Sequence, residues 1–498
     1  MFIGRKAELD FLESKYVEAE SQLVLLYGRR RIGKTETLKE FCKDKKHIFY
    51  SCTQTSAIGQ LSKFSKQILI ENHPAKRYTN EFPDWKGAFS ALKELPFDKE
   101  RKLLVIDEFP TLCKGNESFL WDLKEVWEKE LKNENIIIIL CGSATSYIEK
   151  EILTENNPFY SDLTGVYKME SMGFFDACSF FPYYTSEEKV LAYSVLGGIP
   201  RYLKQFEPTA PLFENIKKKI LTKGSVLYSE ADFALHKELR EVAVYNSIME
   251  TIADGSSRLG DITKGAYIND TAKTSVYIKN LSELGIVERV LPVDAKSKFS
   301  VSSGVYRLTD NFFKFWYSFG LANFSQLEDG DVEGVFKYNV EPLINEYASF
   351  AFVDVCVEYI KKLQKEEKLP FRYSSIGYWC GKTFAKDGAK KKGDVKECNV
   401  DILCMNQDKT EYLIGDCNFS KERYSYSRYE EFRNSLPPFD EDEKVYFAFF
   451  SRSGFDDKLR LEARRNDNLL LFDIDEIVSS KKTPQSFTRK TSMESFLL

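Results

Sequence analysis

Apolar residues in the first third of the chain fall in short unbroken runs. The runs are QLVLLYG (22–28), HIFYSC (47–52), KLLVIDEFP (102–110) and NIIIILCGSA (135–144). Runs of this kind are typical of strands buried on both faces of a parallel sheet. After the first run, Leu38, Phe41 and Cys42 recur at helical spacing. The pattern predicts alternating strands and helices, and therefore a parallel sheet covered on both faces.

The turn after the first run carries three arginines between two glycines. It reads GRRRIGKT (28–35), which we call the glycine loop, and it fits G-x-x-x-x-G-K-[ST]. Backbone N–H groups near Gly33 and the start of the next helix favour phosphate there, Lys34 can reach the outer phosphates, and Thr35 can ligate Mg²⁺. The predicted nucleotide-binding residues are Gly28, Arg31, Ile32, Gly33, Lys34, Thr35 and Glu36. The alternative is a chance match in a loop rich in glycine and lysine. The sequence does not decide whether Arg29, Arg30 and Arg31 contact the nucleotide, a partner domain or solvent.

Two later runs end in polar residues that complete a hydrolytic site. Asp107 would hold the Mg²⁺ shell, and Glu108 would orient or deprotonate the attacking water. Ser143, at the end of another run, is either a sensor of the γ-phosphate or ordinary turn chemistry. Ligands of such sheets bind at the carboxyl ends of the strands, where all these residues fall. The candidate catalytic residues are Glu108 and Lys34.

Composition narrows the class of protein. The 498 residues suggest about three domains, and 43% hydrophobic residues exclude a disordered chain. A net charge of −5 gives no general attraction to nucleic acid or anionic membranes. Ten scattered cysteines without C-x-x-C and three distant histidines argue against disulfides and zinc. The N-terminus MFIGRKAELD carries charged residues from Arg5 onward and lacks the apolar segment of a signal peptide. No uncharged apolar run approaches the roughly 20 residues of a membrane span. We expect a cytoplasmic protein without membrane contact.

Five segments in order resemble the archaeal-type P-loop ATPases of the STAND group of signalling ATPases. They are FIGRKAELDFLE, YGRRRIGKTETLKEF, VIDEFP, LCGSATSYIEKE and GGIPRYLKQF. The resemblance implies that Phe2, Ile3 and Arg5 lie near the adenine. It also implies that Pro200, on a helical lid, closes over the nucleotide. Without the resemblance, GGIP reads as a turn between helices.

One departure from the family concerns an arginine in a segment that usually reads LYGRR. Here the corresponding stretch reads PFYSDLTG, with Ser161 and Asp162 at that place. If the family arginine stabilises transition-state charge, its absence lowers turnover. Binding of ATP is therefore expected more firmly than fast hydrolysis, and an arginine restored at Asp162 should raise the rate.

The middle of the chain predicts a winged helix. Within about 238–310, three helical segments that end at Gly285 precede two short strands, IVERVLPV and GVYRLTD. The third helix is the candidate for a DNA major groove, but Asp270 and Glu283 offset Lys273 and Lys279. The alternative is a spacer or a protein-docking surface. The aromatic stretch NFFKFWYSFG (311–320) is typical of core between domains rather than a platform for bases.

The last third resembles the restriction-endonuclease-like (PD-(D/E)XK) fold in its strands NVDILCMN and EYLIGDCNFS. The resemblance implies two acids that hold Mg²⁺, here Asp401 and Asp416, which we expect side by side. At the position of the family's usual lysine this chain has Asn418, and at the position of the usual helix glutamate it has Val353. Lys421 is a conceivable replacement for the lysine. With no positive group near the acids, we expect a weak metal site and little or no DNA cleavage. The stretch Lys386–Lys396 is the candidate for nucleic acid backbone.

The sequence therefore predicts an α/β multidomain protein that binds ATP and Mg²⁺ and acts as a nucleotide-gated switch with slow hydrolysis. The alternatives are an ATP-controlled DNA nuclease, as in defence or mobile-element functions, and a DNA- or protein-binding scaffold. Expected partners are ATP and ADP, with DNA, a protein partner or a second copy as further candidates. The expected domains are an ATPase core (1–170), a helical lid (171–235), a winged helix (236–315), an aromatic helical connector (316–340), an endonuclease-like domain (341–478) and a mobile tail (479–498).

Overall fold

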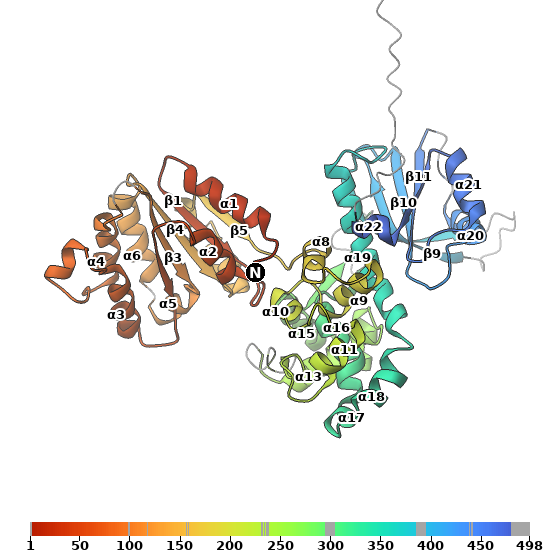
Figure 1. Ribbon diagram of the computed structural model, residues 1–498, viewed down its shortest axis with the longest axis horizontal. Coiled ribbons are helices and arrows are strands. Elements are labelled where there is room, and N and C mark those ends of the chain that lie inside the picture. The colour runs from red at the N-terminus through yellow and green to blue at the C-terminus, as the bar shows by residue number, and fades with distance from the viewer. Residues whose placement is uncertain are drawn as a thin grey trace, which may run out of the picture. The chain divides into compact units, whose positions relative to one another are not determined.

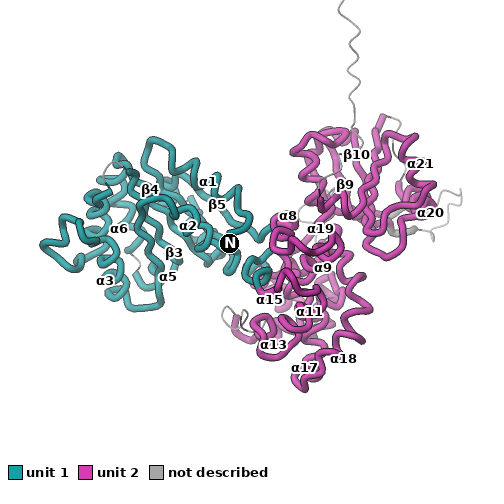
Figure 2. The backbone as a smooth tube through the Cα atoms, in the orientation of Figure 1, with its two compact units in different colours: residues 1–172, 198–204, 283–285 teal, residues 173–197, 205–282, 286–498 magenta. Residues whose placement is uncertain are grey.

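The computed structural model of the chain is multidomain and mixes helices with sheets (Figure 1). It describes residues 2–479 apart from 98–99, 117, 156, 158, 231–232, 234, 236–238, 294–303, 385–394, 438 and 440–441. The expected tail beyond 479 and most of the Lys386–Lys396 stretch lie outside the described residues. The chain forms two compact units: unit 1 comprises 1–172, 198–204 and 283–285, and unit 2 comprises 173–197, 205–282 and 286–498 (Figure 2).

Unit 1 is built on a five-stranded parallel sheet, which confirms the predicted architecture. The strands, in the spatial order β2-β3-β4-β1-β5, are β2 (His47–Ser51), β3 (Lys102–Asp107), β4 (Ile136–Gly142), β1 (Gln22–Tyr27) and β5 (Gly165–Lys168). The helices are α1 (Lys6–Val17), α2 (Lys34–Cys42), α3 (Ala57–Ile68), α4 (Trp85–Ser90), α5 (Pro110–Gly115), α6 (Phe119–Val126), α7 (Thr145–Tyr147) and α10 (Pro200–Leu203). Shorter helical turns are η1 (Pro74–Arg77), η2 (Ala91–Glu94), η3 (Trp127–Leu131), η4 (Ile148–Ile152) and η5 (Tyr160–Asp162).

Strand β1 explains why the apolar runs are unbroken. Its alternate residues enter two separate cores, Leu23 and Leu25 on one face and Val24 and Leu26 on the other. Helices α3 to α6 supply the first core, and α1 and α2 supply the second (Figure 1). Because both faces are covered, the consecutive positions from Leu23 to Leu26 are all apolar.

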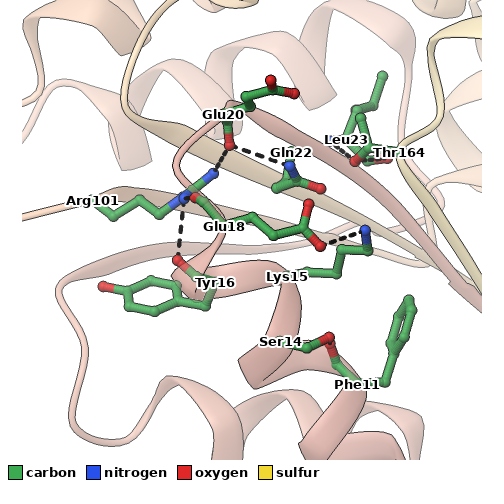
Figure 3. Close-up of polar contacts among 10 residues, drawn as sticks. All are labelled: Phe11, Ser14, Lys15, Tyr16, Glu18, Glu20, Gln22, Leu23, Arg101 and Thr164. Atoms are coloured by element: carbon green, nitrogen blue, oxygen red, sulfur yellow. Dashed lines mark hydrogen bonds and ion pairs between the residues drawn. The ribbon is translucent and has the colours of Figure 1, made fainter.

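The amino edge of this sheet is held by a buried arginine. Arg101 donates to the carbonyl oxygens of Tyr16 (3.1 Å), Glu18 and Glu20, which fixes the loop between α1 and β1 (Figure 3). At the same edge, Thr164 Oγ1 accepts from the backbone N–H of Leu23 (2.9 Å; Figure 3). This edge thus carries structural bonds, and the glycine loop lies at the opposite, carboxyl end of β1.

Unit 2 begins with helices and contains the aromatic stretch. Its helices before the second sheet are α8 (Phe174–Ala177), α9 (Ser186–Leu196), α11 (Leu212–Ile216), α13 (Val242–Ala253), α14 (Leu259–Gly265), α15 (Thr271–Glu283, with Glu283 in unit 1), α16 (Asn311–Phe315), α17 (Phe324–Glu328), α18 (Val332–Val335) and α19 (Ile344–Lys365). Shorter turns are η6 (Cys178–Phe180), η7 (Lys217–Leu221), η8 (Trp316–Gly320), η9 (Leu321–Asn323) and η10 (Phe336–Val340). Six aromatic side chains of 311–320 are buried, namely Phe312, Phe313, Phe315, Trp316, Tyr317 and Phe319. The interpretation of this stretch as core is confirmed.

Helices α13, α14 and α15 are followed by a two-stranded antiparallel sheet of β6 (Val287–Val290) and β7 (Val305–Leu308). Asp270 caps α15, since its Oδ1 accepts from the N–H of Ala272 (2.8 Å). Gly285, with φ of 65°, ends the helix in the left-handed conformation. These are the helices and strands that the sequence pattern predicts for this region.

The second sheet, in unit 2, is mixed. Its order is β12-β11-β10-β9-β8, with parallel pairing among β10, β11 and β12 and antiparallel pairing among β8, β9 and β10. The strands are β8 (Ser375–Phe384), β9 (Val395–Met405), β10 (Glu411–Asn418), β11 (Lys444–Ser451) and β12 (Leu469–Asp473). The helices that join or follow them are α20 (Tyr426–Ser435), α21 (Asp457–Arg465) and α22 (Ile474–Ser479).

Candidate functional site

Glycine is required at two points of the glycine loop. A Cβ on Gly28 would lie 2.2 Å from the carbonyl oxygen of Met169, so no side chain fits there. Gly33 has a φ of 96°, a conformation that L side chains rarely adopt. The following residue, Lys34, begins α2. The loop therefore passes close to the backbone after β5 and turns directly into a helix.

Lys34 lies inside the loop rather than in solvent. Its side chain is only 5% exposed, and its Nζ donates to the carbonyl oxygens of Gly28 and Arg29, at 2.8 Å each. Burial lowers the pKa of Lys34, while the nearby carboxylates of Asp107 and Glu108 oppose that shift. The lysine is thus a desolvated cation at the centre of the loop.

Thr35 and Asp107 meet across two elements. The Thr35 Oγ1, in the first turn of α2, donates to Asp107 Oδ2 at the end of β3 over 2.7 Å. A hydroxyl and a carboxylate are oxygen donors of the kind that Mg²⁺ takes alongside the phosphate oxygens of a nucleotide. The chemistry of this pair therefore fits the implied metal.

Glu108 has an unusual backbone conformation and a polar partner. Its φ is 56°, in the left-handed region that costs a residue other than glycine free energy. Its Oε2 accepts from Ser143 Oγ (2.7 Å), and the same hydroxyl accepts from Arg30 Nε (3.4 Å). Three chain segments that are distant in sequence therefore converge at this edge, with the carboxylate facing Ser143.

The other residues predicted to bind nucleotide near the glycine loop differ in their exposure and in their distance from the loop. Pro200 is close to the loop, because its Cγ would lie 3.7 Å from a Cβ on Gly33. Glu36 is an exposed residue of α2 whose side chain pairs with Lys39 (3.5 Å). Ile32 is buried, at 1% exposure. Arg31 has a φ of 71°, so its backbone also takes part in the sharp turn.

Phe2 and Ile3 are half-buried, whereas Arg5 is fully enclosed by protein. Arg5 Nη1 donates to Glu8 Oε1 (2.6 Å) and to the carbonyl oxygen of Glu170 (2.8 Å), and its Nη2 donates to the carbonyl oxygen of Ile32 (2.5 Å). Its guanidinium therefore supports the glycine loop through the backbone. The sequence pattern did not predict this role, because it depends on contacts between segments that are distant along the chain.

Asp162 lies at the wrong edge of the sheet for catalysis. It precedes β5, which runs parallel to β1 with Gly165 beside Val24, and Thr164 bonds to Leu23 at the start of β1. The glycine loop follows the other end of β1, roughly five residues or 16 Å away. Asp162 instead forms an ion pair with Lys124 of α6. This geometry gives no support to the expectation that an arginine here raises turnover of a nucleotide bound to the same chain, and that expectation stays a prediction.

A second pair of acids lies in the sheet of unit 2. Gly415 of β10 is opposite Ile402 of β9, so the next position of the register sets Asp416 beside Asp401, as predicted. Asp401 Oδ2 accepts from the N–H of Cys417 (2.9 Å). Burial, and then the charge of Asp416, raises the pKa of Asp401 to about 6.

The prediction that nothing positive lies near these acids is wrong. Arg428 Nη2 donates to Asp416 Oδ2 (3.1 Å), and its Nη1 donates to Asn418 Oδ1 (3.1 Å). The hydroxyl of Tyr424 also donates to Asp416 Oδ2 (2.7 Å). Arg428 was missed because it lies on α20, 12 residues beyond Asp416 and outside any motif. The exposed Lys421 is not the group that binds Asp416 in the described structure.

Across the part of the chain that the structure describes, no group of three or more His, Cys, Asp and Glu side chains is arranged to hold a metal ion. No described helix is both long enough and apolar enough to cross a membrane. The described cysteines are free thiols.

Two family patterns match the chain. Residues 2–206 match an ATPase domain found predominantly in Archaea. Residues 316–431 match a family of archaeal and bacterial proteins of unknown function. The first match spans the whole sheet of unit 1 together with the glycine loop and Pro200.

Archaea contain several proteins that are similar to this chain. An uncharacterized protein of Methanocaldococcus jannaschii is 29% identical over 482 residues, which is 96% of this chain and 100% of the relative. An uncharacterized ATP-binding protein of the same organism is 54% identical over 46 residues, 9% of this chain and 78% of the relative. The solved structure of a Walker-type ATPase of Pyrococcus abyssi covers 64% of this chain and 96% of its own, with 19% identity and a TM-score of 0.48.

The parallel sheet, the glycine loop and the strand-end acids define a P-loop ATPase fold. The chain belongs to the archaeal-type P-loop ATPase family, whose ATPase domain occupies residues 2–206.

Proposed function

We propose that this protein binds ATP with Mg²⁺ at the glycine loop and acts as a nucleotide-gated switch of the STAND type with slow hydrolysis. The proposal rests on two hydrogen-bonded pairs at one edge of the sheet. Thr35 Oγ1 donates to Asp107 Oδ2, and Ser143 Oγ donates to Glu108 Oε2, each over 2.7 Å. Buried Lys34 lies in the same loop. This combination supplies a cation for phosphate, oxygen ligands for a metal and a carboxylate for water.

Each group has a distinct part in the proposed reaction. Lys34 would exchange its bonds to loop carbonyls for bonds to the outer phosphates. Thr35 and Asp107 would hold Mg²⁺, which when bound neutralises the charge on the phosphate oxygens. Glu108 would orient the attacking water and accept its proton. Ser143, which already faces Glu108, would contact the γ-phosphate and so report its presence.

Slow hydrolysis follows from the surroundings of Glu108. Its Oε2 accepts a hydrogen bond from Ser143 over 2.7 Å, and a hydrogen bond to the ionised form makes a carboxylate a weaker base for the proton of water. The place of the family arginine is taken by Asp162, at the far edge of the sheet. Any positive group that completes the site would then come from the arginines of the glycine loop, from Arg201 or from a second chain.

The lid segment supports the switch. Met172 N donates to the carbonyl oxygen of Gly198 (2.8 Å), so the residues that enter and leave segment 173–197 are paired within unit 1. Inside unit 2, hydrogen bonds join this segment to α16 and α19. From α16, Asn311 Nδ2 donates to the carbonyl oxygen of Tyr193 (2.9 Å). From α19, the Tyr347 hydroxyl donates to the carbonyl oxygen of Ser194 (2.9 Å), and Glu358 Oε2 accepts from the N–H of Phe174 (2.8 Å). We infer that a shift of Pro200 on nucleotide binding is passed through α9 to α19 and the second sheet.

The domain assignment is part of the same proposal. We assign 171–235 as the lid, 236–315 as a winged helix, 316–340 as a connector and 341–478 as an endonuclease-like domain. DNA is the ligand to be tested at α15 and at the Lys386–Lys396 stretch. A partner protein or a second copy of the chain is the alternative to DNA at α15, because acids offset lysines along that helix.

The test is ATP turnover and Mg-ATP affinity of the full chain, with and without duplex DNA at two salt concentrations. We expect micromolar-range binding that requires Mg²⁺, a slow basal rate, and a change in that rate only with a ligand that engages unit 2. Any binding of DNA should weaken steeply as salt rises. Absence of Mg-dependent ATP binding would refute the proposal. Fast turnover of the isolated chain would refute its slow-switch part.

A further inference from the structure

The second pair of acids does not fit the divalent metal that the endonuclease-like resemblance implies. One oxygen of Asp416 already accepts from both Tyr424 (2.7 Å) and Arg428 (3.1 Å), and one oxygen of Asp401 accepts from the N–H of Cys417 (2.9 Å). The position of the expected lysine is Asn418, whose amide oxygen accepts from the same guanidinium (3.1 Å). A cation is present at this place, and it is a side chain.

We propose that Arg428 is the resident cation of this carboxylate pair and that the domain works without a divalent metal there. The guanidinium is a planar fork, so its two nitrogens can serve Asp416 and Asn418 together. Its carbon also lies 4.8 Å from the ring centre of Tyr424, which is fully buried. Stacking on a fixed ring and a two-point bond hold the charge in one position.

Elementary electrostatics explains why such a group is needed. Two carboxylates in neighbouring strands repel each other, and burial disfavours the ionised form of both, as the raised pKa of Asp416 and of Asp401 shows. Charge from outside the pair relieves this cost. A Mg²⁺ ion would supply it in a nuclease, and Arg428 supplies it here at a fixed position.

The proposal predicts a latent metal site. If Arg428 is removed, the acids lose their cation, and a divalent ion becomes the favourable replacement because carboxylate oxygens are the ligands it prefers. In the unaltered protein, metal must compete with a tethered guanidinium and should not enter. The prediction is independent of the ATP switch, since no residue of the glycine loop takes part.

The experiment is Mn²⁺ binding to the full chain without nucleotide, followed by electron paramagnetic resonance. Arg428→Ala is compared with the wild type, with Arg428→Lys, which keeps a positive charge, and with Arg433→Ala, which removes another arginine of α20. We expect Arg428→Ala alone to gain one Mn²⁺ ion per chain, with at least a tenfold gain in affinity. The double variant Arg428→Ala/Asp416→Asn should lose that ion again. Circular dichroism and ATP affinity serve as controls for folding.

Two outcomes would overturn the proposal. One is a wild-type protein that binds Mn²⁺ at this place, shown by an ion that Asp416→Asn removes. The other is a folded Arg428→Ala protein that gains no ion. If Arg428→Ala does not fold, the wild type and Asp416→Asn still test the proposal. We expect these two proteins to bind the same amount of Mn²⁺, because no ion should depend on Asp416 while Arg428 is present. A plasmid-nicking assay adds a third criterion, because metal-dependent nicking by the wild type that Asp401→Ala and Asp416→Ala both abolish would show a working nuclease.

Discussion

The two sheets each present a pair of acids at strand ends, and the partners of those acids differ. In unit 1, Asp107 and Glu108 accept from the hydroxyls of Thr35 and Ser143. In unit 2, Asp416 accepts from the guanidinium of Arg428. Hydroxyls are neutral groups that can turn toward a metal or a phosphate, whereas a paired guanidinium holds the position a metal would take.

Strand-end acids alone therefore do not define a metal site. What decides is the charge of the group that faces them when the chain is folded. In unit 1 the nearby cation, Lys34, is bonded to loop carbonyls, and the acids keep neutral partners. In unit 2 the cation is bonded to the acid itself. Glu108 and Lys34 test the site of unit 1, and Asp162 and Lys314 test how buried surroundings act on a charge elsewhere, in order from the largest expected effect to the smallest.

The largest effect concerns Glu108. Glu108→Gln keeps the shape and a polar tip but removes the base, so turnover should fall about 10²–10⁴-fold while ATP affinity is retained. Phosphate release and calorimetry measure the two quantities. Glu94→Gln, an exposed glutamate of the same unit, is the matched control. Turnover at the wild-type rate would mean that Glu108 is structural.

Next is the buried cation of the glycine loop. Lys34→Ala should weaken Mg-ATP binding about 100-fold, because charged hydrogen bonds to phosphate contribute roughly 1.5–3 kcal/mol each. Isothermal calorimetry measures the affinity. Lys39→Ala removes an exposed lysine of the same helix and should change little. If both variants bind ATP like the wild type, the loop is not the nucleotide site.

A third substitution tests the edge assigned to Asp162. Its side chain is 6% exposed and pairs with Lys124, so Asp162→Arg sets two cations together in a buried place. We expect the free energy of unfolding to fall by about 3 kcal/mol and turnover not to rise. Denaturant unfolding and ATP turnover are the measurements. Faster hydrolysis by a protein of normal stability would restore the catalytic interpretation of this position.

The smallest effect concerns Lys314, a partly buried cation of unit 2. Burial lowers the pKa of Lys314 to about 8, while Asp354 opposes and Arg307 adds to the shift. Because the folded pKa is below the unfolded value, the unfolded chain binds more protons between pH 8 and 10.5, and wild-type stability rises with pH over that window. At pH 7 the charged lysine is a cost, which Lys314→Met should relieve by about 1–3 kcal/mol.

Thermal unfolding at pH 7 and pH 10 measures that gain, which should fade at the higher pH. Methionine keeps the packing on the rings of Phe350 and Tyr347, so the charge is the main change. Lys337→Met, at an exposed lysine that also lies over a ring, is the control. An equal gain at both pH values would point to packing rather than to charge.

The sequence by itself determined the features that are local to the chain. Unbroken apolar runs predicted the buried parallel strands, because a strand covered on both faces keeps apolar residues at consecutive positions. The glycines of the loop, the start of α2 at Lys34 and the cap of α15 at Asp270 also follow from neighbours within a few residues. Backbone conformation and burial produce a periodic pattern of apolar and polar residues, and this pattern is present in the sequence alone.

Only the tertiary structure decided which charges face one another. The pairing of Glu108 with Ser143, of Asp162 with Lys124 and of Asp416 with Arg428 joins residues of different elements, separated by 35, 38 and 12 positions. No periodicity records such pairs, because they depend on which strand ends are neighbours in a sheet and how the helices between them return. The energy of a charge depends on these surroundings, so two strand-end acids have neutral hydroxyl partners in one sheet and an arginine partner in the other.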